Sequence, residues 1–331
     1  MISAIPVEVA GSDLAADIAD GLVGVEKVLA EAANAEEPLL TEASRHLIDA
    51  GGKRFRATLV LLASHFGDSR DARIVPAAAA IELTHLATLY HDDVMDEASI
   101  RRGHESANSR WSNTIAILTG DFLFARASSL LAELGTEAIR IQAETFAQLV
   151  SGQVAETLGP RPGQDPLAHY LNVVENKTAS LIATAGRFGA LFAMAPADVV
   201  ARIQAASHAL GVAFQLSDDI LDVAAESAQS GKAPGTDLRE GVRSLPVLHA
   251  LASRAPGDDR LRELLSRDGL TDESLHAEAL QVLRAHPAME TAHADVRRWA
   301  DTARPGHPDR APAVTGSCPA RYLARRVQPG C

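Results

Sequence analysis

The sequence predicts an all-α protein. Alanine and leucine are abundant, whereas aromatic residues make up only 4% of the 331 residues, a composition that suits closely packed helices better than sheets. Long segments carry apolar residues at helical spacing, and glycine- and proline-containing loops separate them. With 47% hydrophobic residues, the chain can bury a large core. We expect a single helical domain over residues 1–303.

The charge balance and the cysteines narrow the function classes. The net charge is −12 and no basic run is present, which argues against nucleic-acid binding. Cys318 and Cys331 both lie near the C-terminus, so we expect no disulfide framework in the core and a cytoplasmic location. The N-terminus lacks the pattern of a signal peptide. No apolar run reaches the roughly 18 uncharged residues of a spanning helix, so we expect no membrane insertion.

Helical periodicity runs through residues 12–50, and residues 51–56 follow with the sequence GGKRFR. The glycines end one helix, and three cations precede the next apolar helix, which we place at residues 57–66. Two interpretations stay open for the GGKRFR segment. It is either a cationic loop at a helix end, or an anion site where the glycines let the backbone approach a diphosphate.

An apolar helix from Pro76 ends in the motif DDVMD at residues 92–96. Residues four apart share a helix face, so Asp92 and Asp96 project together while Asp93 points away. Paired carboxylates at the end of a buried helix are costly unless a cation lies between them. Magnesium is the expected ion, because it binds few carboxylates and keeps positions for phosphate.

Further chemistry-bearing residues flank this motif. His85 precedes Asp92 by seven residues on the same helix face, and Glu82, one turn earlier, is placed to orient it. A lone helical histidine is usually structural, and its alignment with the carboxylates makes a functional role an equal alternative. Arg101 and Arg102 follow the motif. They form either a weak surface salt bridge or a clamp on metal-bound phosphate.

The middle of the chain predicts three more helices, at residues 113–135, 138–157 and 166–194. Lys177 and Thr178 lie within the third. A lysine on an apolar helix is often a surface residue whose stem covers apolar neighbours. A role in a pocket is the alternative, and spacing alone does not decide between them.

The aspartate pattern recurs at a second helix end. A helix that starts near Pro196 carries Gln215 and ends in DDILD, residues 218–222, where Asp218 and Asp222 again share a face. The two motifs are 126 residues apart. Two such motifs, each after an apolar helix, favour one metal site built from both over two solvated acidic helix ends.

The C-terminal third becomes more polar. Residues 231–241 read as a loop with Lys232 able to reach back into a site. Further helices are expected at residues 258–267, 272–285 and 287–303. Residues 304–331 are rich in arginine, proline and glycine, and we expect a disordered tail. That mixture is also what a shifted reading frame in GC-rich coding DNA gives.

Together these motifs carry a family resemblance over about residues 15–303. The chain resembles the trans-polyprenyl diphosphate synthases, and most closely the actinobacterial medium- to long-chain type. The motifs that carry the resemblance are GGKRFR at 51–56, His85 with DDVMD at 92–96, RRG at 101–103, GD at 120–121, KT at 177–178, FQLSDDILD at 214–222 and the GK…GTD segment at 231–237. There are two departures. Ala57 stands where the family usually has proline, and the tail replaces a closing helix.

The resemblance implies a helical bundle around a deep central cavity, usually dimeric, that elongates an allylic diphosphate with isopentenyl diphosphate. Carried over to this chain, Asp92 and Asp96 would bind two magnesium ions and Asp218 a third, with Asp222 in support. The implied allylic diphosphate ligands are Arg101, Lys177 and Lys232. The implied isopentenyl diphosphate ligands are Lys53, Arg56, His85 and Arg102. Thr178 and Gln215 would face the allylic cation.

Product length is partly readable from the helix before Asp92. Each turn toward its start lies about 5.4 Å deeper, and the positions offered are the small residues Thr88, Ala87, Thr84 and Ala80. Bulky aromatics close the tunnel there in similar short-chain members. Because each helix turn without a bulky residue deepens the tunnel, we expect a product of about C30 or longer. Its expected use is a quinone side chain such as that of menaquinone.

Other functions remain as alternatives. A short-chain, geranylgeranyl-type synthase would need a floor from Ile81 or another helix. A class I terpene cyclase usually has only one aspartate-rich motif and needs only one diphosphate site. A subunit of a heteromeric synthase is a third alternative, although inert subunits tend to lack the aspartate motifs. A helical repeat scaffold is disfavoured, because no repeat of 30–50 residues is present.

Overall fold

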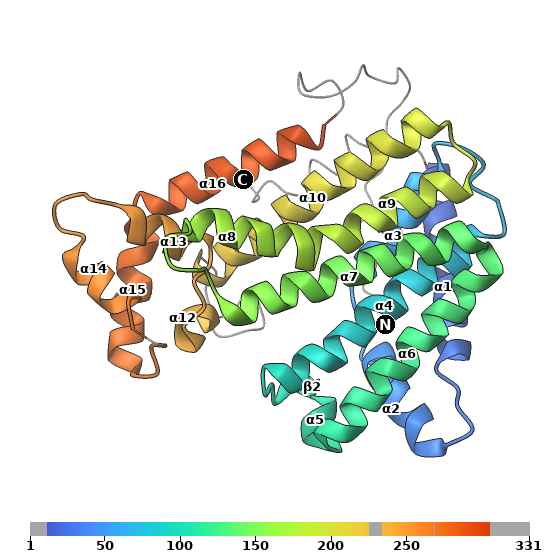
Figure 1. Ribbon diagram of the computed structural model, residues 1–331, viewed down its shortest axis with the longest axis horizontal. Coiled ribbons are helices and arrows are strands. Elements are labelled where there is room, and N and C mark those ends of the chain that lie inside the picture. Colours follow the sequence, from blue (N-terminus) through green and yellow to red (C-terminus); the bar gives the residue numbers. More distant parts are fainter. Residues whose placement is uncertain (1–11, 225–233, 268, 305–331) are drawn as a thin grey trace. The chain divides into compact units, whose positions relative to one another are not determined.

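A computed structural model describes residues 12–224, 234–267 and 269–304 (Figure 1). The described part is helical almost throughout, and its strands are two short segments, β1 and β2. The chain divides into two compact units. The first holds the residues up to 147 together with 181–207, and the second holds 148–180 and the residues from 208 onward.

The first unit is built mainly from the N-terminal helices. Its elements are α1 (Ser12–Ala32), α2 (Pro38–Asp49), α3 (Phe55–Ser64), α4 (Ile74–Met95), β1 (Ile100–Arg101), β2 (His104–Glu105), α5 (Ala107–Arg110), α6 (Asn113–Leu134), the first half of α7 (Thr136–Leu158), nearly all of α9 (Ser180–Phe192) and the start of α10 (Ala197–Ala224). The predicted helices agree with these bounds to within a few residues. The periodicity over residues 12–50 is divided between two helices, α1 and α2.

Helix α4 is the centre of this unit. Every residue from Ala77 to Thr84 is buried, and α1, α3 and α6 all pack against this helix. Figure 1 shows α6 running alongside α4. The two helices approach closely at Gly120 of α6, where an added Cβ would lie only 3.1 Å from the carbonyl oxygen of Ala87. An apolar, alanine-rich sequence on all faces of α4 fits this central position.

A tight hairpin that the sequence did not predict follows α4. Strands β1 and β2 pair antiparallel, with Ile100 opposite Glu105. The turn residues Arg102 and Gly103 have φ angles of 53° and 78°, the left-handed conformation that a two-residue hairpin turn needs at both positions. The hairpin brings Arg101 back toward the end of α4.

The second unit holds the rest of the helices. Its elements are the second half of α7, α8 (Pro166–Val173), the π-helix η1 (Val174–Ala179), most of α10, α12 (Thr236–Glu240), α13 (Leu245–Ala252), α14 (Asp259–Leu265), α15 (Glu273–Ala285) and α16 (Ala288–Thr302). The predicted loop at 231–241 is therefore partly wrong, because Thr236–Glu240 is helical. A buried leucine at 238 explains this short helix.

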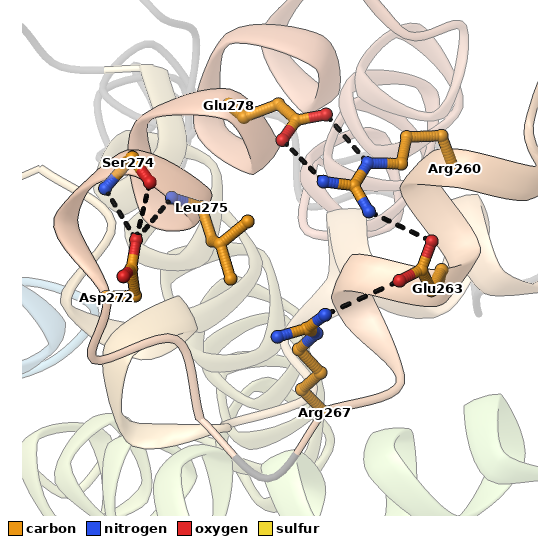
Figure 2. A network of polar contacts seen from close by, with 7 residues as sticks. All are labelled: Arg260, Glu263, Arg267, Asp272, Ser274, Leu275 and Glu278. Carbon is orange, nitrogen blue, oxygen red and sulfur yellow. Dashed lines mark hydrogen bonds and ion pairs between the residues drawn. The ribbon is translucent and has the colours of Figure 1, made fainter.

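Charged residues join the peripheral helices α14 and α15, as Figure 2 shows. Arg260 donates to both carboxylate oxygens of Glu278 at 2.8 Å and to Glu263 at 2.9 Å. Asp272 caps α15 by accepting the N–H groups of Ser274 and Leu275. These groups are largely exposed, so the network orients the helices more than it stabilises them.

Helix α6 is the one described helix whose length and composition would allow it to cross a membrane. It packs along α4 instead. Its outer face keeps large apolar side chains exposed, with Ile117 at 43% and Leu118 at 53%. Cores of globular proteins contain such helices, so this composition alone does not indicate insertion.

Candidate active site

The first aspartate motif occupies the last turn of α4. Asp92 is half-buried and Asp96, the C-cap residue, is exposed, whereas Asp93 is fully buried. The burial of Asp93, with Asp92 and Asp96 more exposed, agrees with the separation that the spacing predicted. Carboxylates at a helix C-terminus lie at the negative end of the helix dipole. Asp92 and Asp96 are thus placed where a bound cation would be stabilising.

Asp93 has a structural partner. Its carboxylate accepts a hydrogen bond from Arg101 Nε at 2.5 Å. Burial raises the pKa of Asp93, and the charge and hydrogen bond of Arg101 partly oppose that rise. Arg101 was predicted to hold the allylic diphosphate. The ion pair occupies its Nε, and the two Nη groups have no hydrogen-bond partner within the described residues, so they remain available to an anion.

Arg102 is tied to the glycine loop. Its Nη1 donates to the carbonyl oxygen of Leu47 at 2.8 Å and also to that of Gly51. An added Cβ at Gly52 would lie 3.1 Å from the same guanidinium. Glycine is favoured at this position, because a φ of 154° would strain any other residue and an added Cβ would press on the guanidinium of Arg102. The loop therefore wraps around Arg102.

The three cations of the GGKRFR segment have different environments. Lys53 is exposed. Arg54 is buried and donates to both carboxylate oxygens of Glu26, the shorter bond being 2.6 Å, and to the carbonyl of Ile48. Arg56 has a buried Nε with no hydrogen-bond partner among the described residues. Arg54 thus anchors the loop to α1, although its Nη1, like Arg56 Nε, is a buried donor without a partner among the described residues and could be satisfied by an anion.

His85 lies among these arginines. Burial lowers the pKa of His85 well below its usual value, and the charges of Arg56, Arg102, Arg54 and Arg101 lower it further. A neutral imidazole can still donate one hydrogen bond to a phosphate. Arg56 and Arg102 therefore form a positive region beside the neutral His85, with the buried Glu82 as its nearby counter-charge.

The expected role of Glu82 needs correction. We expected it to orient His85, but its carboxylate accepts the backbone N–H of Ala57 at 2.9 Å. Ala57 lies in the first turn of α3, where backbone N–H groups lack helical partners. Glu82 therefore accepts a hydrogen bond from a backbone N–H at the start of α3. The two residues are 25 positions apart, so helical spacing cannot reveal this contact.

The predicted chain-length positions lie in the packed interior. Ala80, Thr84 and Ala87 are at most 1% exposed. Thr84 donates to the Ala80 carbonyl at 2.8 Å and accepts a hydrogen bond from Gln142 Nε2 at 2.5 Å. Thr88 is half-buried and donates to the His85 carbonyl. Their role in product length stays a prediction.

The second aspartate motif occupies the end of α10. Asp218 is exposed, Asp222 is half-buried and Asp219 is buried. Asp219 accepts hydrogen bonds from the Tyr170 hydroxyl at 2.5 Å and from the Leu245 N–H at 3.0 Å. Burial raises the pKa of Asp219 to about 6, and these bonds oppose the rise. As in the first motif, the middle aspartate is held inside the protein.

Asp222 is fixed by the start of α12. Its carboxylate accepts the N–H groups of Thr236 and Asp237 at 3.1 and 3.2 Å. Burial, and then the charges of Asp222, Asp219, Glu240 and Asp218, raise the pKa of Asp237 to about 7. This surplus of negative charge and the oxygen donors fit a hard divalent cation.

Within the described residues, no three acidic or histidine side chains lie close enough to hold a metal ion by themselves. A cation bound to either motif would thus complete its shell with ligand or water oxygens, as magnesium does with phosphates. Lys232, predicted to hold the allylic diphosphate, lies outside the described residues.

Lys177 and Thr178 lie on the π-helix η1. Thr178 donates to the side-chain oxygen of Gln215 at 3.1 Å, and Gln215 Nε2 donates to Asp219 at 3.1 Å. The structure thus brings together the two residues predicted to face the allylic cation. Lys177 forms an ion pair with Glu156 of α7. Single-turn π-helices occur often at functional sites, but residue spacing gave no sign of this one.

Carboxylate oxygens suit hard metal ions, and arginine and lysine side chains suit phosphorylated ligands. The model of the polyprenyl synthetase family matches residues 37–283. The chain belongs to this family and is a prenyltransferase.

The chain is 47% identical to a nonaprenyl diphosphate synthase of Mycobacterium tuberculosis, with 89% of this chain and 90% of the relative covered. It is 39% identical to component 2 of a heptaprenyl diphosphate synthase of Geobacillus stearothermophilus, with coverage of 86% and 88%. A crystal structure of a Corynebacterium glutamicum geranylgeranyl pyrophosphate synthase with calcium and isoprenyl diphosphate has a TM-score of 0.85. It is 42% identical, with coverage of 97% and 98%. The isoprenoid synthase fold expected from the sequence is therefore confirmed.

Proposed function

We propose that this enzyme condenses an allylic diphosphate with successive isopentenyl diphosphate units and releases an all-trans polyprenyl diphosphate. The observation that carries the proposal is the positive region of Arg56 and Arg102 beside the neutral His85, separate from the residues of the aspartate motifs. A class I terpene cyclase binds one diphosphate and has no need of a second cationic site. A chain-elongating synthase binds two diphosphates at once.

We assign the metal-binding role to the outer aspartates, Asp92 and Asp96 in one motif and Asp218 and Asp222 in the other. Their half-buried or exposed carboxylates and the surplus charge around Asp237 support this assignment. About three magnesium ions, bound with the diphosphate, would supply positive charge to the leaving group. We do not assign Asp93 and Asp219 as primary ligands, because both side chains are buried in the protein.

The remaining residues divide by substrate. Arg101 and Lys177, together with Lys232, would hold the allylic diphosphate as its charge grows on ionisation. Lys53, Arg56, His85 and Arg102 would hold isopentenyl diphosphate. Thr178 and Gln215 offer oxygen dipoles toward the allylic cation, and a dry helical cavity would keep water from quenching it.

We propose a long product, of about C30 or longer, because small residues occupy successive turns of α4 about 5.4 Å apart. The 47% identity to a nonaprenyl synthase supports this length. The 42% identity to a geranylgeranyl synthase favours the short-chain alternative. A quinone side chain made in the cytoplasm is the proposed use.

The test is an incubation of the purified chain with farnesyl diphosphate, labelled isopentenyl diphosphate and magnesium. We expect products of about C30 or longer, as the depth along α4 implies, and no product after chelation by EDTA. A product of about C20 or shorter would overturn the long-chain assignment. Products formed without isopentenyl diphosphate would indicate a cyclase, and no condensation at all would contradict the proposed function.

We propose that the enzyme is a homodimer that associates through the exposed apolar face of α6. Ile117 and Leu118 lie on that face, 43% and 53% exposed. The relative named as component 2 of a heptaprenyl synthase makes a heteromeric partner the alternative. Light scattering should give twice the chain mass, and Leu118→Glu should give monomers. The matched control Val23→Glu, at an exposed position of α1, should leave the mass unchanged.

A further inference from the structure

Glu156 of α7 holds the ammonium group of Lys177 in an ion pair. The Lys177 side chain is 27% exposed and that of Glu156 45%. Neither the aspartate motifs nor the cationic loop includes Glu156. The pair therefore links a residue of the proposed diphosphate site to a carboxylate that the proposed function leaves without a role.

The backbone fixes this pair. Gly152 lies one turn before Glu156 on α7, and an added Cβ there would be 2.6 Å from the backbone nitrogen of Lys177. Only a glycine allows α7 to approach η1 so closely. Residues four apart share a helix face, so the same contact places the Glu156 carboxylate beside the Lys177 side chain.

The pair has a small effect on stability, because exposed ion pairs contribute little. Its effect on a bound anion is different. A lysine is a compact point charge, and a diphosphate oxygen and the Glu156 carboxylate would compete for it. The carboxylate also repels an approaching anion.

We propose that Glu156 is a positioning residue that holds Lys177 in the substrate-free enzyme and competes with diphosphate for its ammonium group. This inference rests on the proposed role of Lys177 in binding the allylic diphosphate. Glu156 would weaken the binding of inorganic pyrophosphate to Lys177 after each condensation and so favour release of the pyrophosphate. Replacing Glu156 with glutamine removes the charge and keeps the side-chain length.

The test measures the binding of inorganic pyrophosphate, with magnesium present, to the purified full chain by calorimetry. We expect Glu156→Gln to bind pyrophosphate about two- to fivefold more tightly than the wild type, the range that an exposed ion pair represents. Lys177→Gln should bind it more weakly. In the Lys177→Gln background, Glu156→Gln should have a smaller effect than in the wild type, because only the repulsion between the carboxylate and the anion is left to remove. Glu144→Gln is the matched control, since it removes an exposed ion pair with Arg140 on the same helix, and it should bind as the wild type does.

The outcomes separate this inference from the proposed function. If Lys177→Gln weakens binding while Glu156→Gln equals the wild type, the role of Glu156 is wrong and that of Lys177 stands. If Lys177→Gln binds pyrophosphate as tightly as the wild type, the proposed diphosphate role of Lys177 fails, and this inference fails with it.

Discussion

The carboxylate of Glu82, 2% exposed, accepts the backbone N–H of Ala57 at 2.9 Å. Similar enzymes usually carry proline at the position of Ala57, and proline has no N–H to donate. In this chain the substitution thus adds a hydrogen bond between α4 and the start of α3. It also fixes a buried carboxylate beside Arg56 and Arg102.

Glu82→Ala should lower the free energy of unfolding by about 1–3 kcal/mol, because the Ala57 N–H would remain buried without a partner. Urea unfolding followed by circular dichroism measures the change. Glu36→Ala, at an exposed position after α1, is the matched control and should stay within about 0.5 kcal/mol of the wild type. Equal losses for the two variants would show that the hydrogen bond has no net effect.

His85 should make stability depend on pH. Burial and the neighbouring arginines, Arg56 first, hold the pKa of His85 well below 6.5 in the folded chain. Below about pH 6.5, His85 binds a proton in the unfolded chain but not in the folded chain, so the stability of the fold decreases as the pH falls. The slope from this group reaches about 1.4 kcal/mol per pH unit, and above pH 6.5 the contribution is constant.

Urea midpoints of the ligand-free chain between pH 5 and 8, measured for the wild type and His85→Gln, isolate this effect. The wild type should lose more stability toward low pH than the variant, because only the wild type has the buried imidazole. Parallel curves for the two proteins would rule out a depressed pKa at His85.

Gly152→Ala should destabilise the protein by about 1–3 kcal/mol through overpacking, since the new Cβ meets the backbone of Lys177 at 2.6 Å. A glycine-to-alanine change inside a helix normally stabilises by roughly 1 kcal/mol, so the sign is diagnostic. Thermal unfolding gives the measurement.

Gly24→Ala in α1 is the control for Gly152→Ala, because the nearest atom there is a side-chain methyl of Val75 at 3.2 Å that can move. Its effect should be smaller than that of Gly152→Ala. A stabilising Gly152→Ala would mean that α7 and η1 lie further apart than described.

Ala87→Phe should shorten the product, if the proposed tunnel runs along α4. Ala87 is 1% exposed beneath the contact with Gly120, so the larger ring should also cost about 1–3 kcal/mol. Chromatography of the products, on protein shown to be folded, measures the change. Ala16→Phe on the exposed side of α1 should leave the product unchanged, and the same length from Ala87→Phe would remove Ala87 from the tunnel wall.

Local patterns in the sequence predicted the helices and the orientation of the aspartates. Four-residue spacing was sufficient to separate Asp92 and Asp96 from the buried Asp93, because that distinction depends only on helix geometry. Partners distant in the sequence were not predictable. Arg54 and Arg56 look alike in GGKRFR, and the bonds from Arg54 to Glu26 and to the Ile48 carbonyl distinguish them.

The sequence also failed to predict the irregular parts of the backbone. The π-helix around Lys177 and the short helix α12 depend on contacts at Gly152 and on the hydrogen bonds to Asp222. Neither has a periodic signal. Tyr170 was also missed, because its bond to Asp219 joins residues 49 positions apart and no local pattern reveals such a pair.

The central position of α4 has a consequence for engineering and evolution. The residues proposed to set product length are also core residues, and Thr84 is joined to Gln142 by a hydrogen bond. A lineage that changes its product at Thr84 or Ala87 therefore changes its folding stability in the same step. Designed variants with a new product length will need a paired substitution, such as one at Gln142, before they tolerate the change.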